Sequence, residues 1–351
     1  MKDLNKNFKS NFTNSDFIPY LHRKFNTDLT KISAIISDAT KSEEQLIHII
    51  SKHILSNSGK RLRPILMMIT SKIFDYKGDK QYLLASAIEL VHVATLLHDD
   101  IIDNSTIRRF APAAHTIWGQ EAGILVGDFL FTKSFELMVK TKCFESLKII
   151  AGATSNIITG EIGQLTRLKT NKLITESEYY KIINKKTAIL FAASCKVGAI
   201  ISNQPIKVVK TIEEFGTSFG MIYQIIDDTL DYFSDEKEGK HLYKDFEEGK
   251  VTLPIILLKK KLDSSELENL KEIFFDTNNR TKENLNHIIY LLEKYNIINE
   301  LLHILHRYQN DALNLLTSIK GNSDYRGLLY NILQYCIGKV ENCKRYYEIQ
   351  K

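Results

Sequence analysis

Long stretches of this chain repeat apolar residues every three or four positions, and they contain few residues that break helices. The 351 residues include five prolines and 16 glycines, and spacings of three and four are typical of amphipathic helices. No stretch alternates apolar and polar residues between paired turn signals, as strands would. We therefore predict an all-α fold with about ten or more helices. The clearest predicted helices cover residues 44–55, 82–102, 122–139, 177–197, 211–233, 282–294 and 298–316.

The predicted connectors are marked by Gly, Pro, Asn or clustered charges. They cover residues 75–81, 108–120, 202–207, 235–254 and 276–280. None resembles a long Pro-rich or Ser-rich linker between independently folded parts. We therefore predict one domain over residues 1–351.

Charge and cysteine content argue against several protein classes. The 47 Lys and Arg nearly balance 42 Asp and Glu, and the net charge of +5 is no nucleic-acid footprint. The cysteines form no Cys-x-x-Cys pair and no zinc pattern. No apolar run approaches about 18 residues, and residues 1–15 lack the core of a secretory signal. We expect a cytoplasmic protein that at most touches a membrane surface.

Asp99, Asp100 and Asp103 form the sharpest cluster, at the end of an apolar predicted helix. Asp99 and Asp103 are four residues apart and share a helix face. Three such carboxylates repel one another unless a cation or water screens them. Carboxylate oxygens suit Mg²⁺, which also keeps water and phosphate ligands. Taken alone, the cluster fits a solvated acidic helix end equally well.

Asp227, Asp228 and Asp231 repeat this spacing near the end of a second apolar helix. Two copies are much harder to attribute to chance. If the clusters face each other across a cavity, they would hold several Mg²⁺ ions around one diphosphate.

Basic residues flank the first cluster at positions suited to phosphate. Arg side chains clamp phosphate oxygens in pairs, and Lys adds a point charge. Each basic pair alone would more often be surface charge. The candidates are Lys60, Arg61, Arg63, Arg108 and Arg109, and further along the chain Lys186, Thr187, Lys240 and Lys250.

The order of these motifs resembles that of the trans-isoprenyl diphosphate synthases, most closely the long-chain octaprenyl type. The resemblance covers about residues 51–258 and implies an isoprenoid-synthase bundle around a central cavity. It also implies head-to-tail condensation of isopentenyl diphosphate with an allylic diphosphate. The product would be a long all-trans polyprenyl diphosphate, a precursor of quinone side chains.

The resemblance assigns roles residue by residue. Asp99, Asp103, Asp227 and Lys186 would be catalytic, with Asp100, Asp228 and Asp231 in or beside the metal shell. About three Mg²⁺ ions would bind with the diphosphate. The allylic substrate would contact Arg108, Lys186, Thr187, Gln224 and Lys240, and Lys250 is a further substrate-binding candidate. The isopentenyl diphosphate would contact Lys60, Arg61, Arg63, His92 and Arg109, although His92 alone reads as a core histidine.

Three positions depart from the family pattern, because glycine is common at each of them. They are Ser58, Phe110 and Tyr243. Phe and Tyr resist the positive φ that glycine tolerates. All six carboxylates and both arginines remain, so we expect activity to be tuned rather than lost.

Three other functions compete with this interpretation. A class I terpene cyclase would share the first cluster but usually carries an Asn/Ser/Glu metal motif second. An HD-type phosphohydrolase would use His98 and Asp99 and leaves Asp227 unexplained. A non-catalytic subunit of a heteromeric synthase would be expected to have lost Asp residues.

Product length should depend on residues one to two turns before Asp99, where a growing chain would enter the helical core. Val91, Ala94 and Thr95 are small to medium there, whereas relatives making C15 or C20 products tend to have a bulky residue. We expect about seven to ten isoprene units, with a C15 or C20 product as the alternative. Phe135 or Met138 could close the tunnel deeper in the core.

The family also implies a homodimer and transient membrane-surface contact for product release. The exact length, the allylic primer and a heteromeric partner are not fixed by the sequence.

Overall fold

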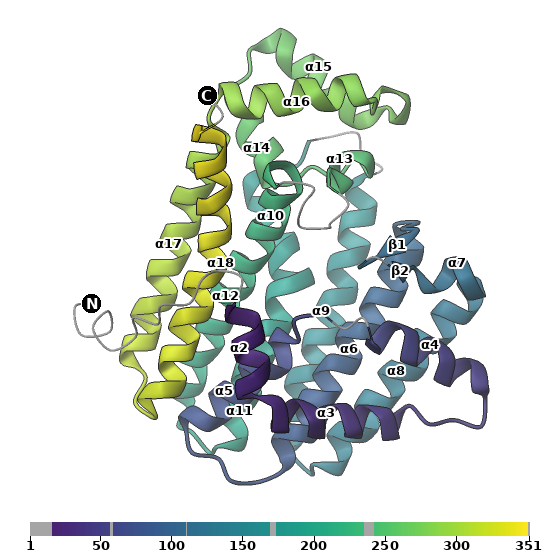
Figure 1. The fold of residues 1–351 in the computed structure, drawn as a ribbon, viewed down its shortest axis with the longest axis vertical. Helices are drawn as coiled ribbons and strands as arrows, with labels where there is room; N and C mark the ends of the chain where they lie inside the picture. Colours follow the sequence, from purple (N-terminus) through teal and green to yellow (C-terminus); the bar gives the residue numbers. More distant parts are fainter. Residues whose placement is uncertain (1–15, 57–58, 110, 169–172, 235–241, 350–351) are drawn as a thin grey trace. The chain divides into compact units, whose positions relative to one another are not determined.

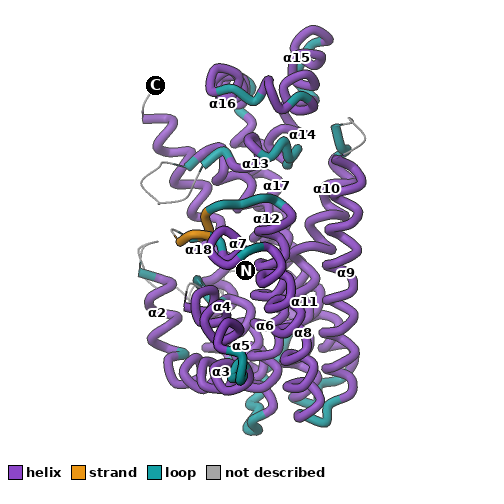
Figure 2. The backbone as a smooth tube through the Cα atoms, turned by 90° about the vertical axis from the view of Figure 1, so that its right-hand side faces the viewer, coloured by secondary structure: helices purple, strands orange, loops and turns teal. Residues whose placement is uncertain are grey.

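The computed structural model describes residues 16–56, 59–109, 111–168, 173–234 and 242–349. Helices make up most of this described chain, as Figure 2 shows. The strands among the described residues are β1 (Ile107–Arg108) and β2 (Ala111–Pro112), which pair antiparallel with Arg108 opposite Ala111. The predicted all-α fold is confirmed.

The chain forms two compact units, each described by itself. Unit 1 contains Met1–Thr154, Leu190–Gly216 and Leu316–Asn331, and unit 2 contains Ser155–Ile189, Thr217–Leu315 and Ile332–Lys351. The prediction of one domain over residues 1–351 stays a prediction. Five helices contribute residues to both units: α9 (Phe144–Leu168), α11 (Ile189–Ile201), α12 (Ile206–Phe233), α17 (Ile297–Ser318) and α18 (Ser323–Ile349).

Unit 1 is built around α6 (Lys80–Ile102), which is labelled in Figure 1. The first Asp cluster lies at the carboxyl end of this helix. Residues on nearly all sides of α6 are buried, and the helix packs against α3, α5 and α8. An apolar helix enclosed in this way holds its last turn firmly. The other helices of unit 1 are α2 (Phe17–Lys24), α3 (Asn26–Ala39), α4 (Gln45–Ser56), α5 (Leu62–Ile73), α7 (Ala114–Trp118) and α8 (Gln120–Lys140).

Unit 2 has helix starts that the sequence encodes directly. Thr175 begins α10 with a capping box, accepting from the Glu178 backbone N–H while the Glu178 carboxylate accepts from the Thr175 N–H. Asp263 and Glu266 do the same for α15. The elements of unit 2 are α10 (Glu176–Ile183), η1 (Asn184–Ala188), α13 (Lys244–Glu247), α14 (Leu253–Lys259), α15 (Ser264–Phe275), η3 (Thr277–Asn279) and α16 (Lys282–Lys294).

Each predicted helix overlaps an observed one. The differences are one predicted helix that is divided into several elements and predicted connectors that contain helices. Residues 282–294 coincide with α16, whereas residues 177–197 fall on α10, the π-helical turn η1 and α11. Two predicted connectors also contain α-helices: residues 108–120 include α7, and residues 235–254 include α13 and the start of α14. A third, residues 276–280, contains the 3-10 helix η3. Pro254 lies in the first turn of α14. Backbone N–H groups in a first turn have no partner within the helix, so proline sacrifices no hydrogen bond there and favours the start of a helix.

The π-helical turn η1 is closely packed within unit 2. A Cβ added to Gly220 on α12 would lie 2.4 Å from the Ala188 Cα. Only glycine permits this approach, so α12 lies directly against the turn that carries Lys186 and Thr187. Single π turns inside helices are frequent at functional sites.

Candidate active site

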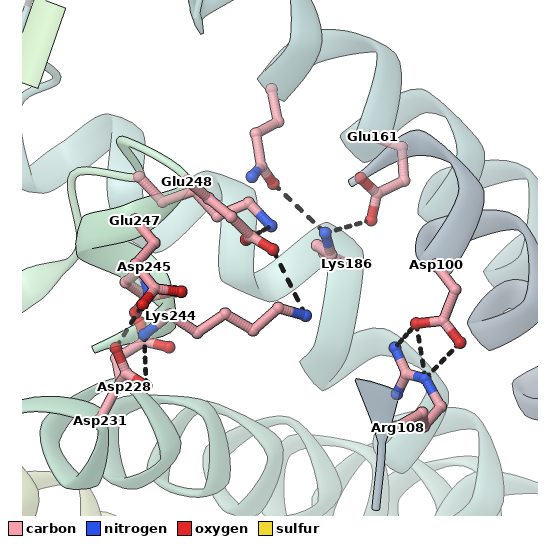
Figure 3. A network of polar contacts seen from close by, with 12 residues as sticks. Asp100, Arg108, Glu161, Lys186, Asp228, Asp231, Lys244, Asp245, Glu247 and Glu248 are labelled. Atoms are coloured by element: carbon pink, nitrogen blue, oxygen red, sulfur yellow. Dashed lines mark hydrogen bonds and ion pairs between the residues drawn. The ribbon is translucent and has the colours of Figure 1, made fainter. Parts of the chain in front are cut away.

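The first Asp cluster divides into a buried and a more accessible part. Asp100 is 2% exposed, whereas Asp99 and Asp103 are half-buried. Arg108, from β1, donates from Nε to both carboxylate oxygens of Asp100 at 2.7 and 2.6 Å (Figure 3). The Nη2 atom of Arg108 also lies 2.5 Å from Asp100 Oδ1. The predicted metal-shell residue Asp100 is therefore occupied in holding Arg108, which leaves Asp99 and Asp103 as the more accessible carboxylates of this cluster.

The predicted isopentenyl diphosphate residues lie at the amino end of α5 and along α6. Arg61 precedes α5 with φ of +47° and donates to the Ser33 hydroxyl at 2.5 Å. The Arg109 guanidinium covers Gly59, whose added Cβ would lie 2.6 Å from its Cζ. Arg109 and His92 line one small cavity, together with Arg108. The Lys60 carbonyl lies 3.1 Å from the His22 ring nitrogen.

Arg63 lies over the Phe191 ring, with its guanidinium carbon 4.3 Å from the ring centre. Burial lowers the pKa of His92 well below its ordinary value, and the positive charges of Arg63 and Arg109 lower it further. His92 is therefore neutral near pH 7. A neutral ring presents one donor and one acceptor beside these guanidinium groups.

Glu89 is a residue of this region that sequence reasoning missed. It is 1% exposed on α6, and its Oε1 has no hydrogen-bond partner among the described residues. Burial raises its pKa, while Arg61, Arg63 and Arg109 oppose the rise. A single acidic residue on an otherwise apolar helix face, three positions before His92, was the available signal.

The second Asp cluster lies on α12 in unit 2, and each of its carboxylates has a different environment. Asp227 is exposed and Asp228 is 5% exposed. The Tyr179 hydroxyl donates to Asp228 at 2.6 Å, and the Gln224 amide donates at 2.7 Å. Asp231 accepts the backbone N–H groups of Lys244 and Asp245 at 3.2 and 3.0 Å, which ties α13 to α12 (Figure 3).

Burial raises the pKa of Asp228 to about 7, against the lowering effect of the Tyr179 and Gln224 hydrogen bonds. The neighbouring Asp227 and Asp231 raise it further. Burial likewise raises the pKa of Asp245, which the sequence analysis did not single out. The cluster therefore holds more negative charge than its surroundings stabilise, so a cation would be bound favourably here.

The predicted substrate-binding residues of unit 2 that the structure describes lie together. Lys186 lies 2.6 Å from the Glu161 carboxylate, and the Thr187 hydroxyl donates to Gln224 at 2.7 Å. Lys250 pairs with Glu248 at 2.6 Å. One cavity of about 270 Å³ is lined by Lys186, Thr187, Gln224, Asp228 and Lys250.

Several predicted features cannot be placed within one site. Lys240, Ser58 and Phe110 lie outside the described residues. Tyr243 has φ of +63°, so it adopts the conformation for which the family often uses glycine. The clusters belong to different units, so their facing each other across a cavity stays a prediction.

The donor chemistry fits Mg²⁺. Within the described residues, no three His, Cys, Asp or Glu side chains converge on one metal position. Mg²⁺ is usually bound by one or two carboxylates plus substrate phosphates and water, so a closed protein cage is not required. The accessible carboxylates Asp99, Asp103 and Asp227 are of the required kind.

The polyprenyl synthetase family model matches residues 44–292, which is more than half of the chain. The chain belongs to the polyprenyl synthetase family. It is similar to the octaprenyl diphosphate synthase of Escherichia coli, with 36% identity over 65% of this chain and 71% of that protein. It is 32% identical to the geranylgeranyl diphosphate synthase of Sulfolobus acidocaldarius over 88% of this chain and 95% of that one.

Among solved structures, the chain is similar to a Caulobacter crescentus polyprenyl synthase complexed with calcium and isoprenyl diphosphate. The TM-score is 0.86 at 32% identity, covering 91% of this chain and 97% of that one. This polyprenyl synthetase family member is thus a prenyltransferase of isoprenoid biosynthesis that performs chain elongation. Membership of this family argues against the terpene cyclase and the phosphohydrolase alternatives. None of the helices in the described ranges is long and apolar enough to span a membrane.

Proposed function

We propose that this synthase joins isopentenyl diphosphate to an allylic diphosphate in a Mg²⁺-dependent reaction and makes a long-chain all-trans polyprenyl diphosphate. The observation that carries the allylic site is the shared cavity of Lys186, Thr187, Gln224 and Asp228, which come from distant parts of the sequence. Cations beside hydrogen-bonded carboxylates are the chemistry that a metal-bound diphosphate requires.

The allylic diphosphate would bind through Lys186, Thr187, Gln224 and Lys250, with Arg108 and Lys240 as the other proposed contacts. Asp99, Asp103 and Asp227 would hold Mg²⁺, which when bound supplies charge stabilisation to the departing diphosphate. The allylic C–O bond breaks and its electron pair leaves with the diphosphate. Lys186 and Lys250 would stabilise that charge, because both line the cavity and are held there by their ion pairs with Glu161 and Glu248 before the reaction.

The isopentenyl diphosphate would be held by Lys60, Arg63, His92 and Arg109, with Arg61 supporting them. Its double bond attacks the allylic carbon, forming the new C–C bond. A proton then leaves the adjacent carbon, and the released diphosphate is the base we propose. Orientation of the two substrates supplies much of the acceleration, because it replaces an encounter in solution.

A long product is favoured by the small side chains on α6. Val91 and Ala94 are fully buried, and the Thr95 hydroxyl donates to its own helix at the His92 carbonyl, 2.7 Å away. The α6 residues about one turn before Asp99, Ala94 to Leu96, are not aromatic. Met138 is buried on α8 and could limit length deeper, whereas Phe135 is 40% exposed.

The test is incorporation of radiolabelled isopentenyl diphosphate with Mg²⁺ and farnesyl or geranylgeranyl diphosphate as primer. We expect extended products on chromatography, and no incorporation after chelation of the metal. A purified, folded protein that extends no allylic primer would contradict the proposal. Parallel assays with liposomes would show whether a membrane surface accelerates product release.

A further inference from the structure

The loop that carries Lys250 begins where α13 ends. The Lys250 N–H donates to the Asp245 carbonyl at 2.7 Å, and the Gly249 N–H donates to Phe246 at 3.0 Å. These two bonds form a Schellman motif, in which the first residue after the C-cap, here Gly249, must adopt a positive φ. Gly249 has φ of +70°. The backbone direction at Lys250 therefore depends on how firmly Gly249 is held.

Arg280, between η3 and α16, packs directly on this glycine. A Cβ added to Gly249 would lie 2.3 Å from Arg280 Nη2 and 2.4 Å from its Cζ. The same guanidinium donates to the Phe274 carbonyl at 2.9 Å and to the Glu247 carbonyl at 3.3 Å. It therefore joins the ends of α13 and α15 and covers the turn between Glu247 and Lys250.

Arg280 also lines the cavity that contains Lys250. Its Nε is buried and has no hydrogen-bond partner in the described chain. A planar guanidinium presents donors in a fixed fork, which a lysine ammonium does not reproduce. The side chain is therefore suited to fixing two carbonyls and one glycine at the same time.

We infer that Arg280 is a positioning residue for the allylic diphosphate site, holding the Gly249 turn so that Lys250 is presented to the cavity. The inference rests on the proposed role of Lys250 in binding that diphosphate. The neighbouring Lys250–Glu248 ion pair, at 2.6 Å, fixes the lysine head from the same loop. Arg280 holds the backbone, and Glu248 holds the side chain.

The experiment is a double-mutant cycle with Arg280→Ala, Lys250→Ala and the double variant, followed by KM for each substrate and by thermal unfolding. Arg280→Ala should raise the KM for the allylic diphosphate about tenfold and leave that for isopentenyl diphosphate within about twofold. If Arg280 acts through Lys250, the double variant should be no weaker than Lys250→Ala alone. Arg280→Lys should fail to restore the KM.

Arg326→Ala is the matched control. Arg326 also donates to a backbone carbonyl, that of Ile319 at 3.0 Å, and its Nε is also buried without a partner among the described residues. It is not one of the residues that line the Lys250 cavity. Its loss should lower Tm and leave both KM values unchanged.

Two outcomes would overturn the inference alone. One is a double variant weakened by the product of the single effects, which would mean that Arg280 acts independently of Lys250. The other is an Arg280→Ala variant that behaves like Arg326→Ala. A Lys250→Ala variant with normal KM would remove Lys250 from the proposed site and overturn the inference with it, whereas failure of the proposed function would appear as no condensation by the unmodified chain.

Discussion

Asp100 and Asp228 hold the same position in their clusters, and both are buried against protein partners. Arg108 holds Asp100, and Tyr179 with Gln224 holds Asp228. The first residue of each cluster, Asp99 or Asp227, is more accessible to solvent. At the residue scale, the first Asp of each cluster is therefore the better candidate for a metal ligand. The second Asp holds neighbouring side chains in place through hydrogen bonds.

Asp99→Ala and Asp227→Ala should each lower kcat about 100-fold to 1,000-fold, because charge stabilisation of the leaving diphosphate is lost. Tm without metal should stay near that of the unmodified protein. Steady-state assays and Mg²⁺ titration would measure the two effects. Asp38→Ala is the control, since Asp38 forms an exposed ion pair with Lys41. Near-normal turnover in a folded Asp99→Ala protein would refute the metal role.

Asp228 makes a pH-dependent prediction for the metal-free protein. Its folded pKa of about 7 lies above its ordinary value of 3.8, so the folded state holds the proton between these values while the unfolded state has lost it. The free energy of unfolding should fall as pH rises from about 4 to 7, by up to about 1.4 kcal/mol per pH unit. Above that range, Asp228 adds no further loss.

Asp228→Asn removes the ionisation and should flatten this part of the profile. Denaturant unfolding in EDTA at several pH values would measure the difference between the two proteins. Equal slopes for both would show that Asp228 is ionised in the folded state at low pH.

The sequence offered candidate site residues where a motif repeats, and it offered few where a single residue stands alone. The repeated Asp spacing made Asp99 and Asp227 metal-ligand candidates, because repetition is hard to explain by chance, and the order of motifs made Lys186 a substrate-binding candidate. Tyr179 and Glu89 were missed, since one polar group on an apolar helix face looks like an ordinary core position. Only the packing of α10 against α12, through the Tyr179 hydrogen bond, gives such a residue its role.

At the scale of elements, the spacing of apolar residues predicted where the long helices lie. It did not predict where a helix is interrupted. The bounds of α16 were predicted as observed, whereas the turn η1 was hidden inside one long predicted helix. A π turn adds a residue but preserves the apolar face on either side, so periodicity alone does not reveal it. The helix α7 was assigned to a connector because five residues are too few to show a period.

Helix α6 makes a prediction about product length. Replacing Ala94 by Phe should shorten the main product towards C15 or C20, because the ring fills apolar volume that a growing chain would occupy. Product chromatography with the same primer would measure it. An unchanged product distribution would contradict the open-tunnel hypothesis.

Ala85→Phe is the matched control on α6. Ala85 is also fully buried, but nine residues place it on the opposite face of the helix. The two variants should lose comparable stability from overpacking. Only Ala94→Phe should change product length.

At the scale of the whole molecule, the homodimer remains a prediction that the surface of α8 supports. Leu125 is 67% exposed and Val139 is 62% exposed. They are 14 residues apart and therefore lie on the same face of α8, and grouped exposed apolar side chains are typical of interaction surfaces. Sedimentation at micromolar concentration should give twice the chain mass. Leu125→Glu should shift it towards one chain.

Ile206→Glu provides the comparison, since Ile206 is 68% exposed at the start of α12. It should leave the sedimentation mass unchanged. A mass of one chain for the unmodified protein would refute the homodimer.

The π turn η1 also affects how the chain can change in length. A π turn contains one residue more than the α turn it replaces, so removing that residue restores an ordinary helix without rotating the segments before and after it. Elsewhere in a buried helix, a one-residue deletion rotates everything that follows by about 100°. Within α10, η1 and α11, the turn at Asn184–Ala188 is thus the place where a residue can be lost with least rotation of the helical segments on either side.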